Sequence, residues 1–229
     1  MRIVCYNCSK QASYTQKVNG LCITDSTLCF EAVNMKIIGI TGAIGCGKTT
    51  VANVIRDLGF EVFDADVGVK AIYENPAFLM QLKGVFPRVF RKDGTVDKPL
   101  LRKIVFCNQA ELLKLENIIE PFLSEMFLNK VNSVAGRQGW LFIDAALLIE
   151  KGWNQRCDKV IGVDADLETQ KRRVMARDNI SEEEFFNIYN LQMNNAKKCE
   201  LVDVVVNTQC DLPELKQRVK KVLKDLDVL

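Results

Sequence analysis

The sequence contains no histidine among its 229 residues. This absence excludes catalysis by an imidazole, including Ser-His-Asp and Cys-His mechanisms, and it excludes the usual His-containing metal sites. No apolar run approaches the roughly 18 to 20 residues needed to cross a bilayer. The net charge of +2 comes from mixed signs spread along the chain, so no dedicated nucleic-acid surface or polybasic membrane patch is predicted. We therefore expect neither nucleic acid nor membrane as a partner.

A disulfide framework is also absent from the pattern. The nine cysteines are scattered and odd in number, and the apolar strands around them are typical of a cytosolic enzyme rather than a secreted scaffold. We therefore predict a cytoplasmic protein in which most cysteines are small buried hydrophobic residues.

Residues 1–34 are polar and irregular, unlike the rest of the chain. Cys5 and Cys8 have the spacing of half a zinc ribbon, but the second pair, Cys22 and Cys29, is separated by six residues instead of two to four. We interpret the segment as an N-terminal extension, either a disordered leader or a start-site artefact, because Met35 opens the first strand directly.

The strongest motif follows that strand, at residues 42–49, and fits the phosphate-loop pattern G-x-x-x-x-G-K-[ST]. Glycines let backbone N–H groups turn toward phosphate oxygens, and the helix that follows presents its positive end. Lys48 is predicted to reach the β- and γ-phosphates of a nucleoside triphosphate, and Thr49 to bind Mg²⁺. The predicted nucleotide-binding residues here are Gly42, Ala43, Ile44, Gly45, Cys46, Gly47, Lys48, Thr49 and Thr50.

Two further strands end in carboxylates. Residues 60–63 lead to Asp64 and Asp66, and because ligands bind beyond the carboxyl ends of parallel strands, Asp66 is the candidate base. The alternative, that one of these residues only caps the next helix, suits Asp64 better. Residues 140–143 lead to Asp144 in a Walker B pattern, which predicts a second Mg²⁺ ligand.

Helical patterns fill the remaining segments. Residues 67–135 contain no convincing strand, include a helix over 111–131 that Pro121 should break, and form a helical insert suited to the second substrate. Residues 166–198 are predicted to form lid helices, with one helix running from Ser181 to about Lys198. Arg173 and Arg177 lie four residues apart on one helical face, where they could close on polyphosphate or simply be solvated.

Five strands alternating with helices, without hairpin signals, predict an α/β fold. The fold class is a P-loop NTPase with a five-stranded parallel doubly wound sheet, extending over residues 35–229 and closed by a C-terminal amphipathic helix.

These motifs together resemble the dephospho-CoA kinase family from Met35 to the C-terminus. The residues that carry the resemblance are the phosphate loop, Asp64-Ala65-Asp66, Asp93-Gly94-Thr95-Val96, residues 143–150 with their Leu-Leu-x-Glu element, Thr169-Gln170-Lys171-Arg172-Arg173 and Arg177-Asp178.

The resemblance implies transfer of the ATP γ-phosphoryl group to the ribose 3′-hydroxyl of dephospho-CoA, which gives coenzyme A and ADP. It implies that Asp66 activates the hydroxyl, that Lys48 and Arg173 stabilise the transferring group, and that Arg177 and Asn207 contact the nucleotide. The implied cofactors are ATP and Mg²⁺, the implied partner is the small molecule dephospho-CoA, and we expect a monomer or a weak homo-oligomer.

Five positions depart from the family pattern. Glu120 precedes Pro121 where the family has histidine, and the other departures are Lys98, Ala146, Asn190 and Thr208. Two alternatives therefore remain: another small-molecule kinase of the nucleoside monophosphate kinase type, or an inactive relative that binds ATP.

Overall fold

The computed structural model describes residues 16–18, 21–24, 27–29, 35–106, 108–134 and 139–229. A five-stranded parallel sheet lies at its centre, with strand order β5-β6-β4-β7-β8. The predicted parallel α/β sheet is therefore confirmed. Its strands are β4 (Lys36–Thr41), β5 (Glu61–Asp64), β6 (Trp140–Asp144), β7 (Lys159–Asp164) and β8 (Val204–Asn207).

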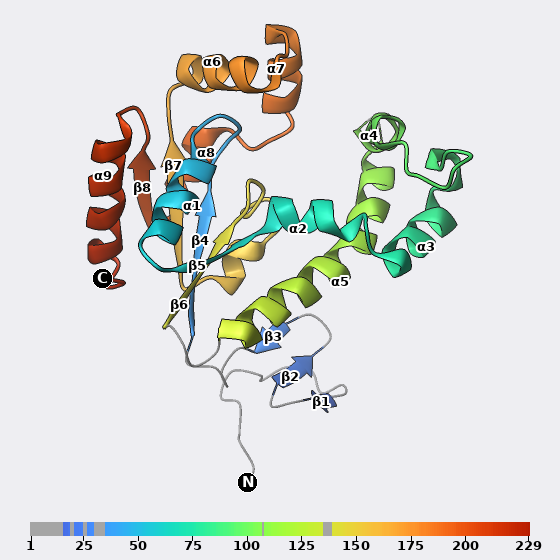
Figure 1. Cartoon of the computed structure of the whole chain (residues 1–229), viewed down its shortest axis with the longest axis horizontal. Coiled ribbons are helices and arrows are strands. Elements are labelled where there is room, and N and C mark those ends of the chain that lie inside the picture. Colours follow the sequence, from blue (N-terminus) through green and yellow to red (C-terminus); the bar gives the residue numbers. More distant parts are fainter. Residues whose placement is uncertain (1–15, 19–20, 25–26, 30–34, 107, 135–138) are drawn as a thin grey trace.

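Helices cover both faces of this sheet, as in a doubly wound fold (Figure 1). The alternation of side chains along β6 shows why both faces need cover: Phe142 packs in one core cluster, whereas Leu141 and Ile143 pack in the other. The first cluster lies under α1 (Lys48–Asp57) and α9 (Leu212–Asp225). The second contains α5 (Gln109–Val134), whose buried face includes Phe127.

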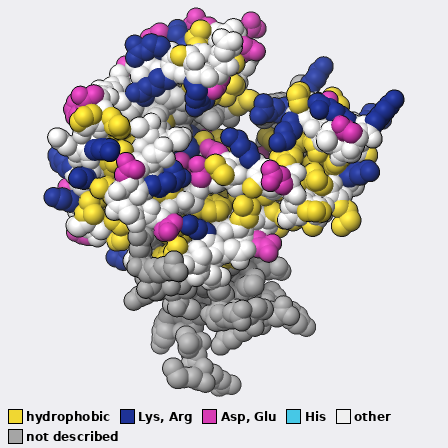
Figure 2. Space-filling model, viewed as in Figure 1, with side chains coloured by type: hydrophobic (Ala, Val, Ile, Leu, Met, Phe, Trp, Pro, Cys, Tyr) yellow, Lys and Arg dark blue, Asp and Glu magenta, His cyan; other side chains and the backbone are white. Residues whose placement is uncertain are grey.

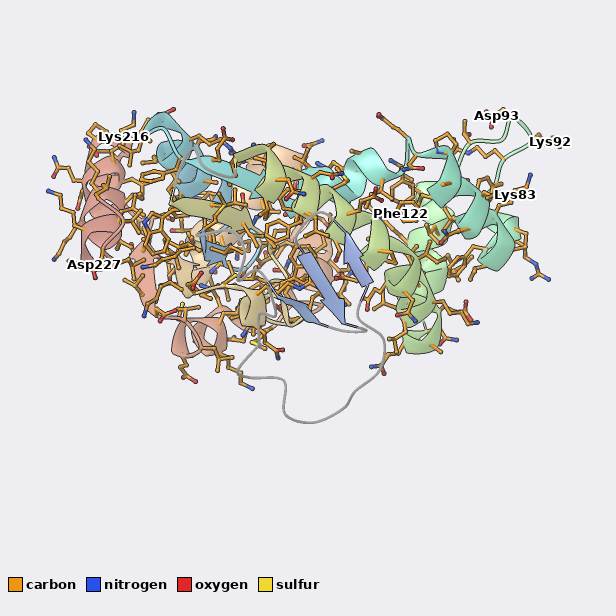
Figure 3. The ribbon with its side chains drawn as sticks, turned by 90° about the horizontal axis from the view of Figure 1, so that it is seen from below. Lys83, Lys92, Asp93, Phe122, Lys216 and Asp227 are labelled. Atoms are coloured by element: carbon orange, nitrogen blue, oxygen red, sulfur yellow. The ribbon has the colours of Figure 1, made fainter. Side chains whose placement is uncertain are left out.

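The predicted helical insert extends sideways from the sheet (Figure 1). In Figure 3, Lys83, Lys92 and Asp93 mark its outer end, and Lys216 and Asp227 mark the opposite end of the molecule. Its elements are α2 (Ala65–Ile72), α3 (Pro76–Val85), the 3-10 helix η1 (Pro87–Val89), α4 (Lys98–Phe106) and α5.

Helix α5 corrects one expectation, because it continues through Pro121 instead of breaking there. Proline removes one intrahelical hydrogen bond, but Ile118, Leu123 and Phe127 on either side of it are buried in the core. Phe122 also stacks edge-on against Phe78 of α3, with ring centroids 5.7 Å apart. Tertiary packing on both sides of the proline therefore outweighs the lost hydrogen bond.

Helices α6 and α7, which follow β7 within the segment predicted as a lid, stand over the phosphate-loop end of the sheet (Figure 1). The single helix expected from Ser181 to Lys198 is wrong: α7 ends at Tyr189, and a separate α8 begins at Asn195 and packs against β7. The helices after β7 are α6 (Leu167–Asp178), α7 (Glu182–Tyr189) and α8 (Asn195–Glu200), and the 3-10 helix η2 (Trp153–Arg156) precedes β7.

Three short strands lie within the N-terminal extension and form an antiparallel sheet of order β1-β2-β3. The irregular pattern expected there does not extend to these strands, which are β1 (Gln16–Val18), β2 (Leu21–Thr24) and β3 (Thr27–Cys29). The proposed zinc pair Cys5 and Cys8 lies outside the described residues. None of the described helices is both long and apolar enough to cross a membrane.

Candidate active site

The phosphate loop connects the buried end of β4 to the first turn of α1. Gly45 and Gly47 have φ values of +80° and +94°, which side chains rarely adopt. A Cβ on Gly45 would lie 2.6 Å from the Gln170 carbonyl oxygen of the lid, and one on Gly47 would lie 3.0 Å from Thr208 Oγ1. Glycine is therefore required both by the turn and by the close approach of neighbouring segments.

A pocket of about 570 Å³ opens beside this loop. Figure 2 shows the surface hollowed between the lid and the insert, with charged side chains at the hollow. The pocket combines residues from the sheet, the insert and the lid, and its lining consists of Gly42, Ala43, Ile44, Gly45, Gly47, Lys48, Thr49, Thr50, Asp66, Ala146, Leu147, Arg173, Val174, Arg177 and Gln192.

Lys48 at the pocket wall pairs with two carboxylates, of which only Asp66 also lines the pocket. Lys48 Nζ donates to Asp66 Oδ2 at 3.3 Å and also pairs with Asp144 Oδ1. The strand register explains this meeting, because Asp64 and Asp144 are paired neighbours at the ends of β5 and β6. Asp64 caps α2 by accepting a hydrogen bond from Val67 N, as predicted, and this places Asp66 in the first turn.

The two carboxylates differ in exposure. The side chain of Asp66 is 57% exposed, whereas that of Asp144 is 1% exposed. Burial alone would lower the pKa of Lys48, but the charges of Asp144 and Asp66 outweigh it and raise that pKa above its usual value. Lys48 is therefore a cation throughout the physiological range.

The predicted metal ligands Thr49 and Asp144 come from the first turn of α1 and from the end of β6. Thr49 lines the pocket in the first turn of α1, and the buried Asp144 Oδ2 has no hydrogen-bond partner within the described part of the chain. A carboxylate oxygen without a hydrogen-bond partner and a hydroxyl oxygen are both ligands of the kind that Mg²⁺ prefers. These two residues therefore fit a magnesium site.

Arg173 lies at the pocket, and its guanidinium hydrogen-bonds to carbonyl and hydroxyl oxygens of the protein. It donates to the Thr208 carbonyl oxygen at 2.8 Å, to Thr208 Oγ1 at 2.9 Å and to the Gly45 carbonyl oxygen at 3.4 Å. Arg177 also lines the pocket and pairs with Asp178. The arginine pair is therefore present at the site, with Arg173 bracing the phosphate loop.

The predicted nucleotide contact Asn207 is not among the residues that line the pocket. Its side chain accepts hydrogen bonds from Arg218 and from Gln209 N. The next residue, Thr208, instead reaches the phosphate loop and donates to the Cys46 carbonyl oxygen at 2.6 Å. The described contact with the phosphate loop thus comes from Thr208, and the nucleotide contact of Asn207 stays a prediction.

Sequence reasoning missed two amide side chains on the phosphate loop. Gln192 accepts a hydrogen bond from Ile44 N, and Asn195 accepts one from Ala43 N, each at 2.8 Å. Both lie between the end of α7 and the start of α8, about 150 residues from the loop, and no local pattern distinguishes them from surface amides. Their role depends on the break between α7 and α8.

The departures from the family pattern have specific contacts. Glu120 accepts hydrogen bonds from Trp153 Nε1 at 3.2 Å and from Arg156 at 3.0 Å, so it joins α5 to η2. The Nζ of Lys98 lies 4.7 Å from the Tyr73 ring centroid. Ala146 lines the pocket with its neighbour Leu147, and Asn190 ends α7.

Comparison with known proteins agrees with this geometry. The sequence model of the family described as dephospho-CoA kinase matches residues 36–214. The chain belongs to the dephospho-CoA kinase family. Dephospho-CoA kinases of Bartonella henselae and Aquifex aeolicus are 38% and 34% identical to it, and each alignment covers 84% of this chain and 98% of the relative.

Solved structures also match this member of the dephospho-CoA kinase family. The crystal structure of TT1252 from Thermus thermophilus aligns with a TM-score of 0.77 at 33% identity, over 84% of this chain and 98% of that one. A dephospho-CoA kinase from Campylobacter jejuni aligns with a TM-score of 0.56 at 23% identity, over 83% and 96%. The first similarity extends to sequence, and the second shows the fold.

Proposed function

We propose that this protein transfers the γ-phosphoryl group of ATP to the ribose 3′-hydroxyl of dephospho-CoA, giving coenzyme A and ADP. The observation that carries the proposal is Lys48 at the phosphate loop, held between an exposed Asp66 and a buried Asp144. Family membership supplies the acceptor, and this cluster supplies the groups that phosphoryl transfer needs.

Each residue has a defined role in this proposal. Asp66 accepts the proton of the 3′-hydroxyl while the hydroxyl oxygen forms a bond to the γ-phosphorus of ATP. The bond between the γ-phosphorus and the oxygen that leaves with ADP breaks. Asp66 suits this task because it faces the pocket and is exposed enough to reach an acceptor. Lys48 neutralises charge on the transferring group, and the glycine-rich loop binds the remaining phosphates.

Thr49 and Asp144 would hold Mg²⁺, which supplies positive charge to the phosphate oxygens when bound. Arg173 and Arg177 extend the cationic wall of the pocket on the lid side. We propose that Arg173 exchanges its contacts with Thr208 for the phosphates when ATP enters, and stabilises the transition-state charge there.

We place the activity in the cytoplasm, because Cys46, Cys157, Cys199 and Cys210 all carry free thiols. The protein would work as a monomer or a weak homo-oligomer on a small-molecule acceptor.

A coupled ADP-release assay with ATP and Mg²⁺ tests the proposal. Dephospho-CoA should be phosphorylated, whereas AMP, CMP and pantetheine phosphate should not. Turnover with only one of the rival acceptors would assign the protein to another class of small-molecule kinase. Tight ATP binding without any turnover would instead identify an inactive relative.

A further inference from the structure

Two backbone N–H groups at the start of the phosphate loop are already occupied by side chains. Ala43 N donates to Asn195 Oδ1 and Ile44 N donates to Gln192 Oε1, both at 2.8 Å. Both acceptors come from the segment between the end of α7 and the start of α8, which is far away in sequence. An anion that enters the pocket therefore meets a loop in which the N–H groups of Ala43 and Ile44 already have acceptors.

The side chain of Asn195 is fixed in a single orientation. It is 4% exposed, and its Nδ2 donates to Asp164 Oδ1 at 2.6 Å and to the Val163 carbonyl oxygen at 3.3 Å. Because Nδ2 faces two acceptors and Oδ1 faces a donor, a flipped amide would lose these hydrogen bonds. Asn195 therefore ties the end of β7 to the beginning of the phosphate loop.

The segment that carries both amides is itself anchored in the core. Lys198, which is 0% exposed, pairs with Glu150 Oε1 at 2.9 Å and donates to the Ala146 carbonyl oxygen at 2.5 Å. Met193 N donates to the same Glu150 oxygen at 3.0 Å. Asn195 and Gln192 are thereby held in place by the turn that follows β6, which also lines the pocket at Ala146.

We propose that Asn195 and Gln192 are positioning residues for ATP binding. They saturate the amides of Ala43 and Ile44, so that the nucleotide phosphates are received by the later amides, from Gly45 to the first turn of α1. Because the first residues of the loop are already held in place, the later backbone N–H groups can bind the phosphates without a rearrangement of the loop. This inference rests on the proposed function only in taking ATP as the ligand.

The first test measures the Kd of ATP by titration calorimetry, at a temperature at which each variant is folded. Asn195→Leu keeps a similar volume but cannot accept from Ala43 N, so the Kd should rise about tenfold or more, by the loss of a buried hydrogen bond. Asn187→Leu makes the same change at an exposed position of α7 and should leave the Kd unchanged.

A charge swap provides the rescue experiment. Asn195→Asp alone should weaken ATP binding, because a carboxylate would face Asp164 Oδ1. In the double variant with Asp164→Asn, the amide at position 164 can donate to the carboxylate at position 195, and the net charge equals that of the wild type. We expect the double variant to recover most of the lost affinity, which a general loss of stability would not predict.

Gln192→Met supplies a second variant in case substitution of the buried Asn195 prevents folding. Gln192 is half-buried at the pocket wall, so its replacement should raise the Kd and KM for ATP about threefold to tenfold, with a smaller effect on kcat and on the melting temperature. Gln217→Met, on an exposed face of α9, is its matched control.

Wild-type Kd and KM values for ATP in folded Asn195→Leu or Gln192→Met would overturn the inference and leave both residues a purely structural role. The titration needs no acceptor, so its outcome is independent of dephospho-CoA. Wild-type protein that binds ATP but does not phosphorylate dephospho-CoA would overturn the proposed function alone. Wild-type protein that does not bind ATP would overturn both.

Discussion

Lys48 Nζ lies 3.3 Å from Asp66 Oδ2 while the same ammonium group pairs with the buried Asp144. Lys48 thus joins two carboxylates of different exposure: 57% of the Asp66 side chain is exposed but only 1% of the Asp144 side chain. The substrate that accepts the phosphoryl group can therefore reach Asp66 but not Asp144. From this difference we propose that Asp66 accepts the proton and that Asp144 compensates charge or binds the metal.

Asp66→Asn should therefore lower kcat by about 10² to 10⁴, because an amide cannot accept the hydroxyl proton. The Kd of ATP should change little, since the phosphate loop remains intact. Steady-state kinetics and ATP titration measure the two effects. The matched control is Asp57→Asn, at an exposed position of α1 that pairs only with Lys216 among the described residues. Unchanged turnover in Asp66→Asn would exclude Asp66 as the base.

Lys48→Ala should abolish most activity without unfolding the sheet, so the circular dichroism spectrum should be retained. It should also lower the free energy of unfolding by about 3 kcal/mol, because it leaves the buried Asp144 without its counter-charge. Adding Asp144→Asn removes that charge, and the double variant should regain stability but not activity. Equilibrium denaturation of the four proteins measures the coupling, and strictly additive losses would contradict a buried ion pair.

Glu120 should be important for the stability of the insert rather than for nucleotide binding. Glu120→Ala removes the acceptor for Trp153 Nε1 and Arg156, so the free energy of unfolding should fall by about 1 to 3 kcal/mol. Glu125→Ala, exposed on the same helix, should change it by less than about 0.5 kcal/mol. Equal stability of the two variants in urea denaturation would show that the network around Glu120 contributes nothing.

The stability of the protein should decrease in alkaline solution. Burial raises the pKa of Cys157 from 9.0 to about 12 and that of Cys46 from 9.0 to about 11. Above pH 9 the unfolded chain therefore loses thiol protons that the folded chain keeps. Each buried thiol then lowers the free energy of unfolding by about 1.4 kcal/mol per pH unit, until the pH reaches the pKa of that thiol in the folded chain. Below pH 9 both states keep these protons and the effect disappears.

Cys157→Ala provides the check, because this residue lies away from the pocket. The variant should have a flatter dependence of unfolding free energy on pH between 9 and 11 than the wild type, whatever its stability at pH 7. Parallel curves over that range would contradict the raised pKa of Cys157.

Most of the site could be predicted from the sequence, because its parts are local. The phosphate loop, Asp64 as a helix cap and the carboxylates after two strands each depend on a few adjacent residues and on the common edge of parallel strands. The capping box of Ser181 and Glu184 at the start of α7 is likewise a pattern of adjacent residues. Local hydrogen bonding and strand order suffice for these elements.

Contacts between distant segments could not be predicted in the same way. Pro121 predicts a helix break, but α5 stays continuous because the residues around Phe127 pack in the core. The end of α7 depends on hydrogen bonds that Met193 and Gln192 make with other elements. The partners of Asn195 come from β7 and from the phosphate loop, so no periodic pattern records them.

The sequence by itself determined the parallel α/β fold, the ATP-binding loop and the family, since these follow from hydrophobic periodicity and from motifs within single strand-loop-helix units. Only the tertiary structure decided that Thr208 contacts the loop, that Arg173 braces it, and that Gln192 and Asn195 accept hydrogen bonds from Ile44 N and Ala43 N. The physical reason is that buried polar groups must find partners wherever the fold brings them, and these partners are far apart in the chain.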